Sequence, residues 1–215
     1  MCRNINSVFF TYVLCEEDSS GNFKVSDTLL KCFHDAKADF SHLLFEMLMT
    51  LFFTISSENN MHKHNHLVSL LLKTLLKGGK MYPINIIELI VTICVPHIIT
   101  SYLKVHDHHP HKHHAIDFMN SIFTNHYYKE NAFIREKLMN ILSDIIQRYL
   151  TTYPQSLFEF MRSIASLKIG VIKVLLPQIE SIIIDLEKYK RPNAASLRYT
   201  WNQFQNFIRN MENKQ

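Results

Sequence analysis

The chain has 215 residues, of which 47% are hydrophobic, and its formal net charge is only +4. A chain of this length and composition can bury a complete core. So small a charge argues against the strongly basic surface of a dedicated nucleic-acid-binding domain. Only four glycines and six prolines are present, which argues against a many-stranded β protein and against a flexible linker. We therefore expect one helical domain over residues 1–215.

The cellular context is read from the cysteines, the N-terminus and the apolar segments. The N-terminus lacks a signal-peptide pattern, and the one strongly apolar stretch, residues 83–103, contains Glu88 and Pro96 and is interpreted as a buried core helix and not as a membrane span. We expect an intracellular protein that is cytoplasmic rather than nuclear. The cysteines are too widely spaced for a zinc knuckle or a compact disulfide framework, and we expect reduced, buried thiols. They are Cys2, Cys15, Cys32 and Cys94.

The N-terminal third is the least readable part of the chain. Within residues 1–35, the apolar run from Val8 to Leu14 is interpreted as a first helix, although periodicity does not separate helix from strand in so short a run. From Asp39 to Phe52, apolar residues recur at three- and four-residue steps and predict a helix. A further helix is predicted over residues 67–75, ending at the glycine pair Gly78-Gly79.

The helical period is clearest after residue 83. A helix beginning at Pro83 is expected to kink or break near Val95, because Pro96 removes a backbone donor. Residues 115–126 and 133–150 each carry an apolar stripe, and their short polar connection predicts an antiparallel hairpin.

The C-terminal part repeats this pattern. Helix is predicted from Pro154 through Ile164 and again from Ile169 to Tyr189, with Gly170 and Pro177 as expected interruptions. The last helix has one apolar face and one polar face. The apolar face consists of Ala194, Leu197, Trp201, Phe204, Ile208 and Met211. The whole chain is expected to hold about eight to ten helices.

Two segments resemble HEAT repeats, the helical hairpins of importin-like and TOG-type solenoids. Residues 175–185, with Pro177 inside and Asp185 at the end, resemble the first helix of the repeat. Residues 131–142, in which the aliphatic-arginine pair Ile134-Arg135 follows a short polar turn, resemble its turn and second helix. The resemblance implies an all-α fold of the HEAT/ARM type, an α-solenoid of antiparallel helical hairpins.

The resemblance also implies a function. TOG domains bind tubulin through the loops inside successive hairpins, and the equivalent loops here are basic and aromatic. We therefore expect a non-catalytic scaffold that binds a protein partner, with tubulin as the candidate; membrane binding is not expected, and the oligomeric state stays open. The loop residues concerned are Tyr127, Tyr128 and Lys129, and Lys188, Lys190 and Arg191.

A second interpretation is nucleic-acid association, which we weigh below a protein partner. Residues 187–215 hold six basic residues against Glu187 and Glu212, so this segment accounts for the whole excess of positive charge. On the predicted last helix, Arg198 and Arg209 lie opposite the apolar face and could attract phosphates.

A third interpretation is metal binding in the histidine-rich loop over residues 105–114. Imidazole is a good ligand for zinc, copper or nickel, but a specific site needs three or four ligands held in fixed geometry. The histidines in question are His106, His108, His109, His111, His113 and His114. The alternative is a solvated loop that gains charge below about pH 6.5. No catalytic motif and no phosphate-binding loop is found in the sequence, and no cofactor is expected.

Overall fold

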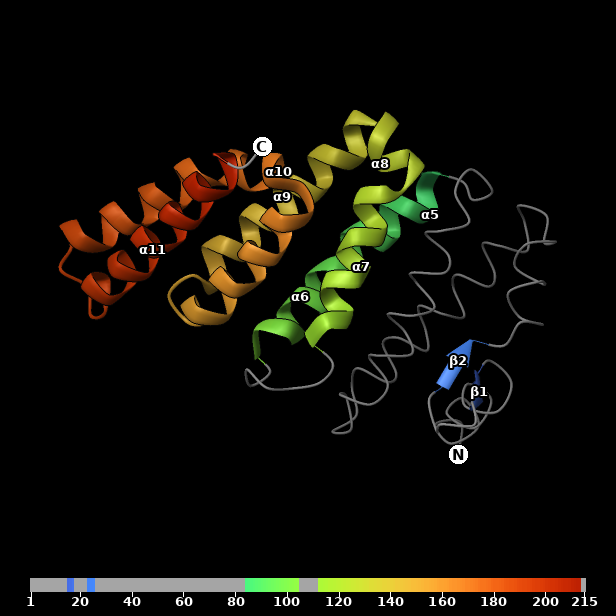
Figure 1. Cartoon of the computed structure of the whole chain (residues 1–215), viewed down its shortest axis with the longest axis horizontal. Helices are drawn as coiled ribbons and strands as arrows, with labels where there is room; N and C mark the ends of the chain where they lie inside the picture. The colour runs from blue at the N-terminus through green and yellow to red at the C-terminus, as the bar shows by residue number, and fades with distance from the viewer. Residues whose placement is uncertain (1–14, 18–22, 26–83, 105–111, 214–215) are drawn as a thin grey trace. The chain divides into compact units, whose positions relative to one another are not determined.

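The computed structural model describes residues 15–17, 23–25, 84–104 and 112–213 (Figure 1). The helices predicted for residues 8–14, 39–52 and 67–75 lie outside the described residues. Nearly all of the described chain is helical, which confirms the all-α prediction for these residues. None of the helices described over residues 84–213 has the length and apolarity that spanning a bilayer requires.

The described residues separate into two compact units, each assembled from two stretches of sequence. The first contains the described residues up to Ile90 together with residues 113–134, and the second contains residues 91–104, 112 and 135–213. The prediction of a single repeat domain, its antiparallel hairpins and its eight to ten helices stays a prediction.

The first unit begins with a feature that the sequence did not indicate. Strands β1 (Cys15–Glu17) and β2 (Phe23–Val25) pair antiparallel, with Cys15 opposite Val25. Three residues on each strand make a very short ladder, which has no alternating pattern long enough to be recognised in advance. Helix α5 (Ile84–Leu89) belongs to the same unit.

Helices α7 (Lys112–Thr124) and α8 (His126–Glu130) complete the first unit. The stripe predicted for α7 is confirmed, because Phe118, Met119 and Ile122 are almost fully buried. The two helices are separated at Asn125, whose buried side chain accepts a hydrogen bond from the Tyr127 backbone N–H at 2.9 Å and so caps α8.

The disturbance predicted near Val95 takes the form of a wider helical turn. A π-helical segment, η3 (Ile90–Cys94), follows α5 directly and leads into α6 (Val95–Lys104). Pro96 is the second residue of α6, and in a regular α-helix its ring would clash with the carbonyl of Thr92, inside η3. A π-helical turn of this kind is a recognised way to accommodate such an interruption.

Helix α9 (Ala132–Tyr149) lies mostly in the second unit and is the one-sided helix that its sequence predicts. Leu138 and Ile145 are buried, whereas Asn140 and Asp144 are exposed. Its start is fixed by Asn131, whose side-chain oxygen accepts hydrogen bonds from the backbone N–H groups of Phe133 at 2.9 Å and Ile134 at 3.3 Å.

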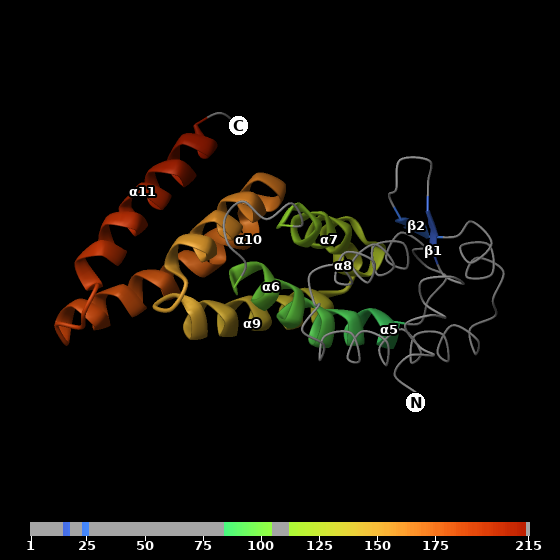
Figure 2. The same cartoon turned by 90° about the horizontal axis from the view of Figure 1, so that it is seen from below.

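Helix α10 (Pro154–Lys188) is two helices joined at a kink. The backbone leaves helical geometry at Lys168 (φ −155°, ψ 84°), two residues before the glycine where an interruption was expected. The other expected interruption, at Pro177, is absent from the backbone angles of α10; this proline is exposed, so the carbonyl that loses its partner can face water. Figure 2 shows the change of direction along α10.

Helix α11 (Ala194–Glu212) packs beside the second half of α10 as the other arm of a hairpin (Figures 1 and 2). Its predicted face is confirmed, since Leu197, Trp201, Phe204 and Ile208 are buried. Tyr199, off that stripe, is exposed. The hairpin of α10 and α11 carries most of the basic residues named above.

Candidate interaction surface on the C-terminal hairpin

An aromatic cluster holds the hairpin together. Phe158 from the first half of α10 contacts Trp201 and Phe204 from α11, with ring centroids 6.1 and 5.3 Å apart, and Trp201 lies 5.9 Å from Phe204. All three side chains are almost completely buried. Aromatic rings in tilted contact at these distances add to the energy of burial itself, so α11 is firmly attached to α10.

Glu180 forms the polar centre of the same hairpin. One of its carboxylate oxygens accepts a hydrogen bond from the indole N–H of Trp201, with the Gln205 amide nitrogen 3.4 Å from the same atom. The other oxygen pairs with Arg198 Nη1 at 2.5 Å. The indole N–H of Trp201 therefore finds a charged acceptor although its ring is buried.

Arg198 is held by a second carboxylate as well. Its Nε and Nη2 donate to the two carboxylate oxygens of Glu187 at 2.8 and 2.7 Å, a two-point geometry that guanidinium and carboxylate groups favour. These hydrogen bonds lower the pKa of Glu187 and, together with those to Glu180, raise the pKa of Arg198. Arg198 was predicted from the sequence as a binding residue. Its charge is instead paired with Glu180 and Glu187 within the hairpin.

Glu180 and Glu187 were not predicted as partners of this arginine. The two carboxylates precede it by 18 and 11 residues and lie on another helix across a turn, so helical periodicity does not relate them to Arg198. The signal becomes visible only when α10 and α11 are paired as a hairpin, since the short turn then brings the end of α10 beside the start of α11.

The turn between the two helices carries the exposed charge. We call Lys188, Tyr189, Lys190 and Arg191 the hairpin tip. All four are exposed, and the Lys188 ammonium lies 5.6 Å from the centre of the Tyr189 ring. Within residues 84–104 and 112–213, none of the three cations has a carboxylate at ion-pair distance. The sequence placed the basic surface partly on the turn and partly on the last helix. In the structure, the unpaired charge of this hairpin is concentrated at the tip.

An apolar surface runs along the second half of α10. We call Gly170, Val174, Pro177, Ser181 and Ile184 the outer seam; all five are exposed, Val174 by 68% and Ile184 by 49%. Their spacing alternates between four and three residues, which places them on one side of the helix. Val174 and Ile184 are the two large aliphatic members of the seam, and exposed apolar surface along one side of a helix makes it a candidate interaction surface.

The other predicted loop lies in the first unit, on α8. Tyr128 is only 3% exposed, and its ring lies 5.3 Å from that of Phe123, so its side chain is part of the local core. Tyr127 is half-buried, with its ring 5.6 Å from the His126 ring, and Lys129 is exposed. Of the three residues predicted there, only Tyr127 and Lys129 reach the surface.

The remaining predicted residues are Arg209 and the histidines. Arg209 is exposed near the end of α11, with its Nη1 3.5 Å from the Asn206 side-chain oxygen. His113 is exposed on α7 and His114 lies beside it in the chain. The other loop histidines, His106, His108, His109 and His111, lie outside the described residues. The described residues contain no cluster of three potential metal ligands, and metal binding stays a prediction.

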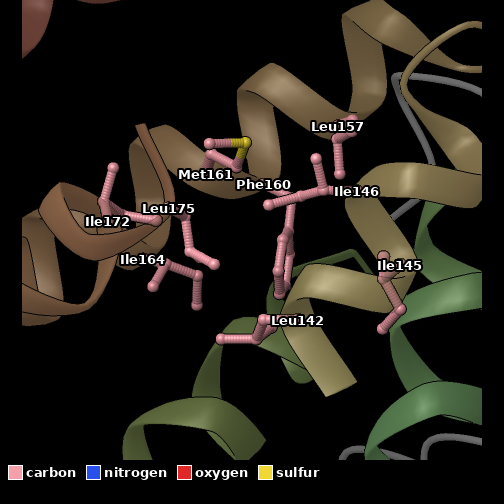
Figure 3. Close-up of a pocket in the computed structure, with 9 residues that line it drawn as sticks. All are labelled: Leu142, Ile145, Ile146, Leu157, Phe160, Met161, Ile164, Ile172 and Leu175. Carbon is pink, nitrogen blue, oxygen red and sulfur yellow. The ribbon is translucent and has the colours of Figure 1, made fainter. Parts of the chain in front are cut away.

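The second unit also contains a small apolar pocket (Figure 3). Its lining comes from α9 and from both halves of α10, so the kink at Lys168 lets two helical segments cover the same face of α9. The cavity measures about 10 Å³, which is the space of a single water molecule. The cavity is thus too small for a ligand larger than water. The lining residues are Leu142, Ile145, Ile146, Leu157, Phe160, Met161, Ile164, Ile172 and Leu175.

Comparison with known proteins gives a match to one family model. The model described as "S-phase genomic integrity recombination mediator, C-terminal" matches residues 1–208. The chain belongs to this family. Neither the curated proteins nor the solved structures compared with the chain give a match.

Membership of the recombination mediator family corrects one expectation and removes the support from another. Maintenance of the genome in S phase takes place in the nucleus, so the prediction of a cytoplasmic rather than nuclear protein is wrong. The resemblance to HEAT and TOG domains is not matched by a family model, and tubulin as a partner has no support. A helical protein that works through binding partners agrees with the family description.

Proposed function

We propose that this chain is a non-catalytic helical scaffold in S-phase genome maintenance, and that the outer seam of α10 binds an amphipathic helix of a protein partner. Two observations support the proposal. The first is that the family is described as a recombination mediator, a term for a protein that acts through its partners. The second is that the exposed apolar seam lies on α10, whose opposite side is buried.

The spacing of the seam specifies the occupant. Positions 170, 174, 177, 181 and 184 follow the alternating four- and three-residue spacing by which one helix packs along another. The small residues Gly170 and Ser181 alternate with the larger Val174 and Ile184, which leaves hollows into which the side chains of a partner helix fit. A helix laid in a groove by such anchors is a common mode of peptide recognition.

The energy available is sufficient for a specific contact. Full burial of a valine or isoleucine side chain contributes about 1.5–3 kcal/mol relative to leaving it exposed. Val174 and Ile184 are the most exposed aliphatic side chains in the described part of α10. They are therefore the anchors whose replacement should abolish binding.

Affinity capture with matched variants tests the proposal. The wild type, the double variant Val174→Asp/Ile184→Asp and the control Gln147→Asp/Gln203→Asp are immobilised and exposed to nuclear extract from S-phase cells. The control adds two carboxylates at exposed polar positions on α9 and α11. We expect genome-maintenance proteins to be captured by the wild type and the control and lost from the seam variant.

Retention of the same proteins by the seam variant would refute the assignment of the seam, and capture of none by the wild type would refute the scaffold function. Equal melting temperatures of the three proteins show that the substitutions act on binding and not on folding.

A further inference from the structure

We propose that the hairpin tip binds single-stranded nucleic acid, with its three cations on the phosphates and Tyr189 stacked on a base. This site lies beyond the proposed scaffold function and rests on different residues. Its elements are exposed positive charge, an exposed aromatic ring and a backbone that holds both in place.

The charge at the tip is not cancelled by its surroundings. Glu187, the acidic residue next to Lys188 in the chain, is bound by Arg198 through two hydrogen bonds. Asp185 is the remaining carboxylate in the last turn of α10, against the three cations of the tip. The local balance is therefore positive, and polyanion binding releases counterions in proportion to the phosphates contacted.

The exposed aromatic ring favours a single strand over a duplex. Tyr189 is 67% exposed, and its ring is beside the Lys188 ammonium. An exposed tyrosine among cations can stack on an unpaired base while the cations contact the backbone, the combination found in proteins that bind single strands without sequence preference. In a duplex the bases are already stacked on each other, so this contribution is lost.

The backbone of the tip is fixed in advance. Lys190 adopts the left-handed conformation (φ 48°), and the Arg191 N–H donates to the Leu186 carbonyl at 2.9 Å. This is the pattern of a Schellman motif, which closes the end of α10. The Ala194 N–H then donates to the Arg191 carbonyl at 3.3 Å. Because the loop is ordered before binding, little entropy is lost when a strand is bound.

Fluorescence anisotropy with a labelled oligothymidine of 15 nucleotides tests the site. The variant Lys188→Gln/Lys190→Gly/Arg191→Gln removes the charge, and the glycine keeps the left-handed conformation. Three phosphate contacts predict a slope of log affinity against log salt of about −2 for a single strand. We expect the charge variant to lose most of this slope together with most of its affinity at low salt.

Two further variants separate the site from general attraction. Tyr189→Ala should weaken binding roughly fivefold or more while keeping the salt slope, since stacking is lost and charge is not. Arg209→Gln removes one exposed cation near the far end of α11, about 22 Å along the helix from its start at Ala194, and should leave binding unchanged.

Several results would overturn the proposal. These are absence of binding by the wild type at low salt, an equal loss in Arg209→Gln, or tighter binding of a duplex than of the single strand. Displacement of the oligonucleotide by an equal concentration of a glutamate-rich peptide would assign the tip to an acidic protein instead. Oligouridine in parallel distinguishes RNA from DNA as the strand that is bound. Unchanged melting temperatures exclude unfolding as the cause of any loss.

Discussion

Glu180 connects three side chains of the C-terminal hairpin. It accepts a hydrogen bond from Trp201, pairs with Arg198 at 2.5 Å and lies within reach of Gln205. An indole N–H inside an aromatic cluster needs such an acceptor, because a buried donor without a partner is costly.

Replacing Glu180 with alanine should therefore destabilise the protein. We expect a loss of about 1–3 kcal/mol, the usual cost of leaving a buried donor unsatisfied. Glu180→Gln keeps an acceptor for the Trp201 N–H and should cost less. Urea denaturation of the three proteins followed by tryptophan fluorescence measures the difference, since Trp201 is the single tryptophan of the chain. Equal stabilities of the alanine and glutamine variants would contradict the role given to this carboxylate.

Cys94 gives a prediction about reactivity. It is completely buried at the end of η3, and burial raises the pKa of its thiol to about 12. The thiolate is the reactive form, so the folded protein should not be modified at this position near pH 8. The number of thiols titrated with a disulfide reagent should be the same for the native wild type and native Cys94→Ala. In denaturant the wild type should show one thiol more.

At the residue scale, the sequence predicted which side chains are buried more reliably than which charged side chains lack an ion-pair partner. The buried face of α11 was predicted from its spacing alone, because a 3.6-residue period identifies one side of a helix. The same period placed Arg198 on the polar side, which is correct, but it could not show that two glutamates from another helix bind it. Long-range pairing depends on the register of the hairpin, and no local pattern encodes that register.

At the scale of the elements, long helices were predicted and local irregularities were not. Helix α9 deviates from its predicted bounds by one residue at each end. Strands β1 and β2 and helix α8 are too short to show a period. The kink of α10 lies at Lys168, a residue with no intrinsic preference against a helix. It accompanies the packing of both halves of α10 on α9, which is a tertiary effect.

Gly170, just after this kink, gives a prediction for the element. It lies in a helical segment, it is exposed, and apart from its chain neighbours and its own helical backbone no atom would lie within 4 Å of an added Cβ. Gly170→Ala should therefore stabilise the protein by about 0.5–1 kcal/mol, because glycine loses more conformational freedom in a helix than alanine does. Thermal unfolding followed by circular dichroism measures the gain. A loss of stability would mean that the kink requires the freedom of glycine at this position.

At the scale of the whole chain, the family match and the structure supply different kinds of information. The family places the protein in genome maintenance, whereas the described helices show which surfaces are free to bind. Sequence periodicity indicated all-helical architecture without a partner, and the tubulin hypothesis arose from loop composition that many helical proteins share. Function lies in such surfaces and not in the fold that carries them.

The two proposed surfaces lie on the same helix but should act independently. Val174 precedes Lys188 by 14 residues, which corresponds to about 21 Å along α10, and the Debye length at physiological salt is about 8 Å. A charge introduced by Val174→Asp is therefore screened from the hairpin tip, so this variant should lose the protein partner and keep wild-type affinity for the oligonucleotide. The variant Lys190→Gly/Arg191→Gln should do the reverse. Capture experiments with and without saturating oligonucleotide measure both properties on the same samples. Joint loss in either variant, at an unchanged melting temperature, would mean that the seam and the tip form one binding site, because two independent surfaces on a folded protein would not both fail.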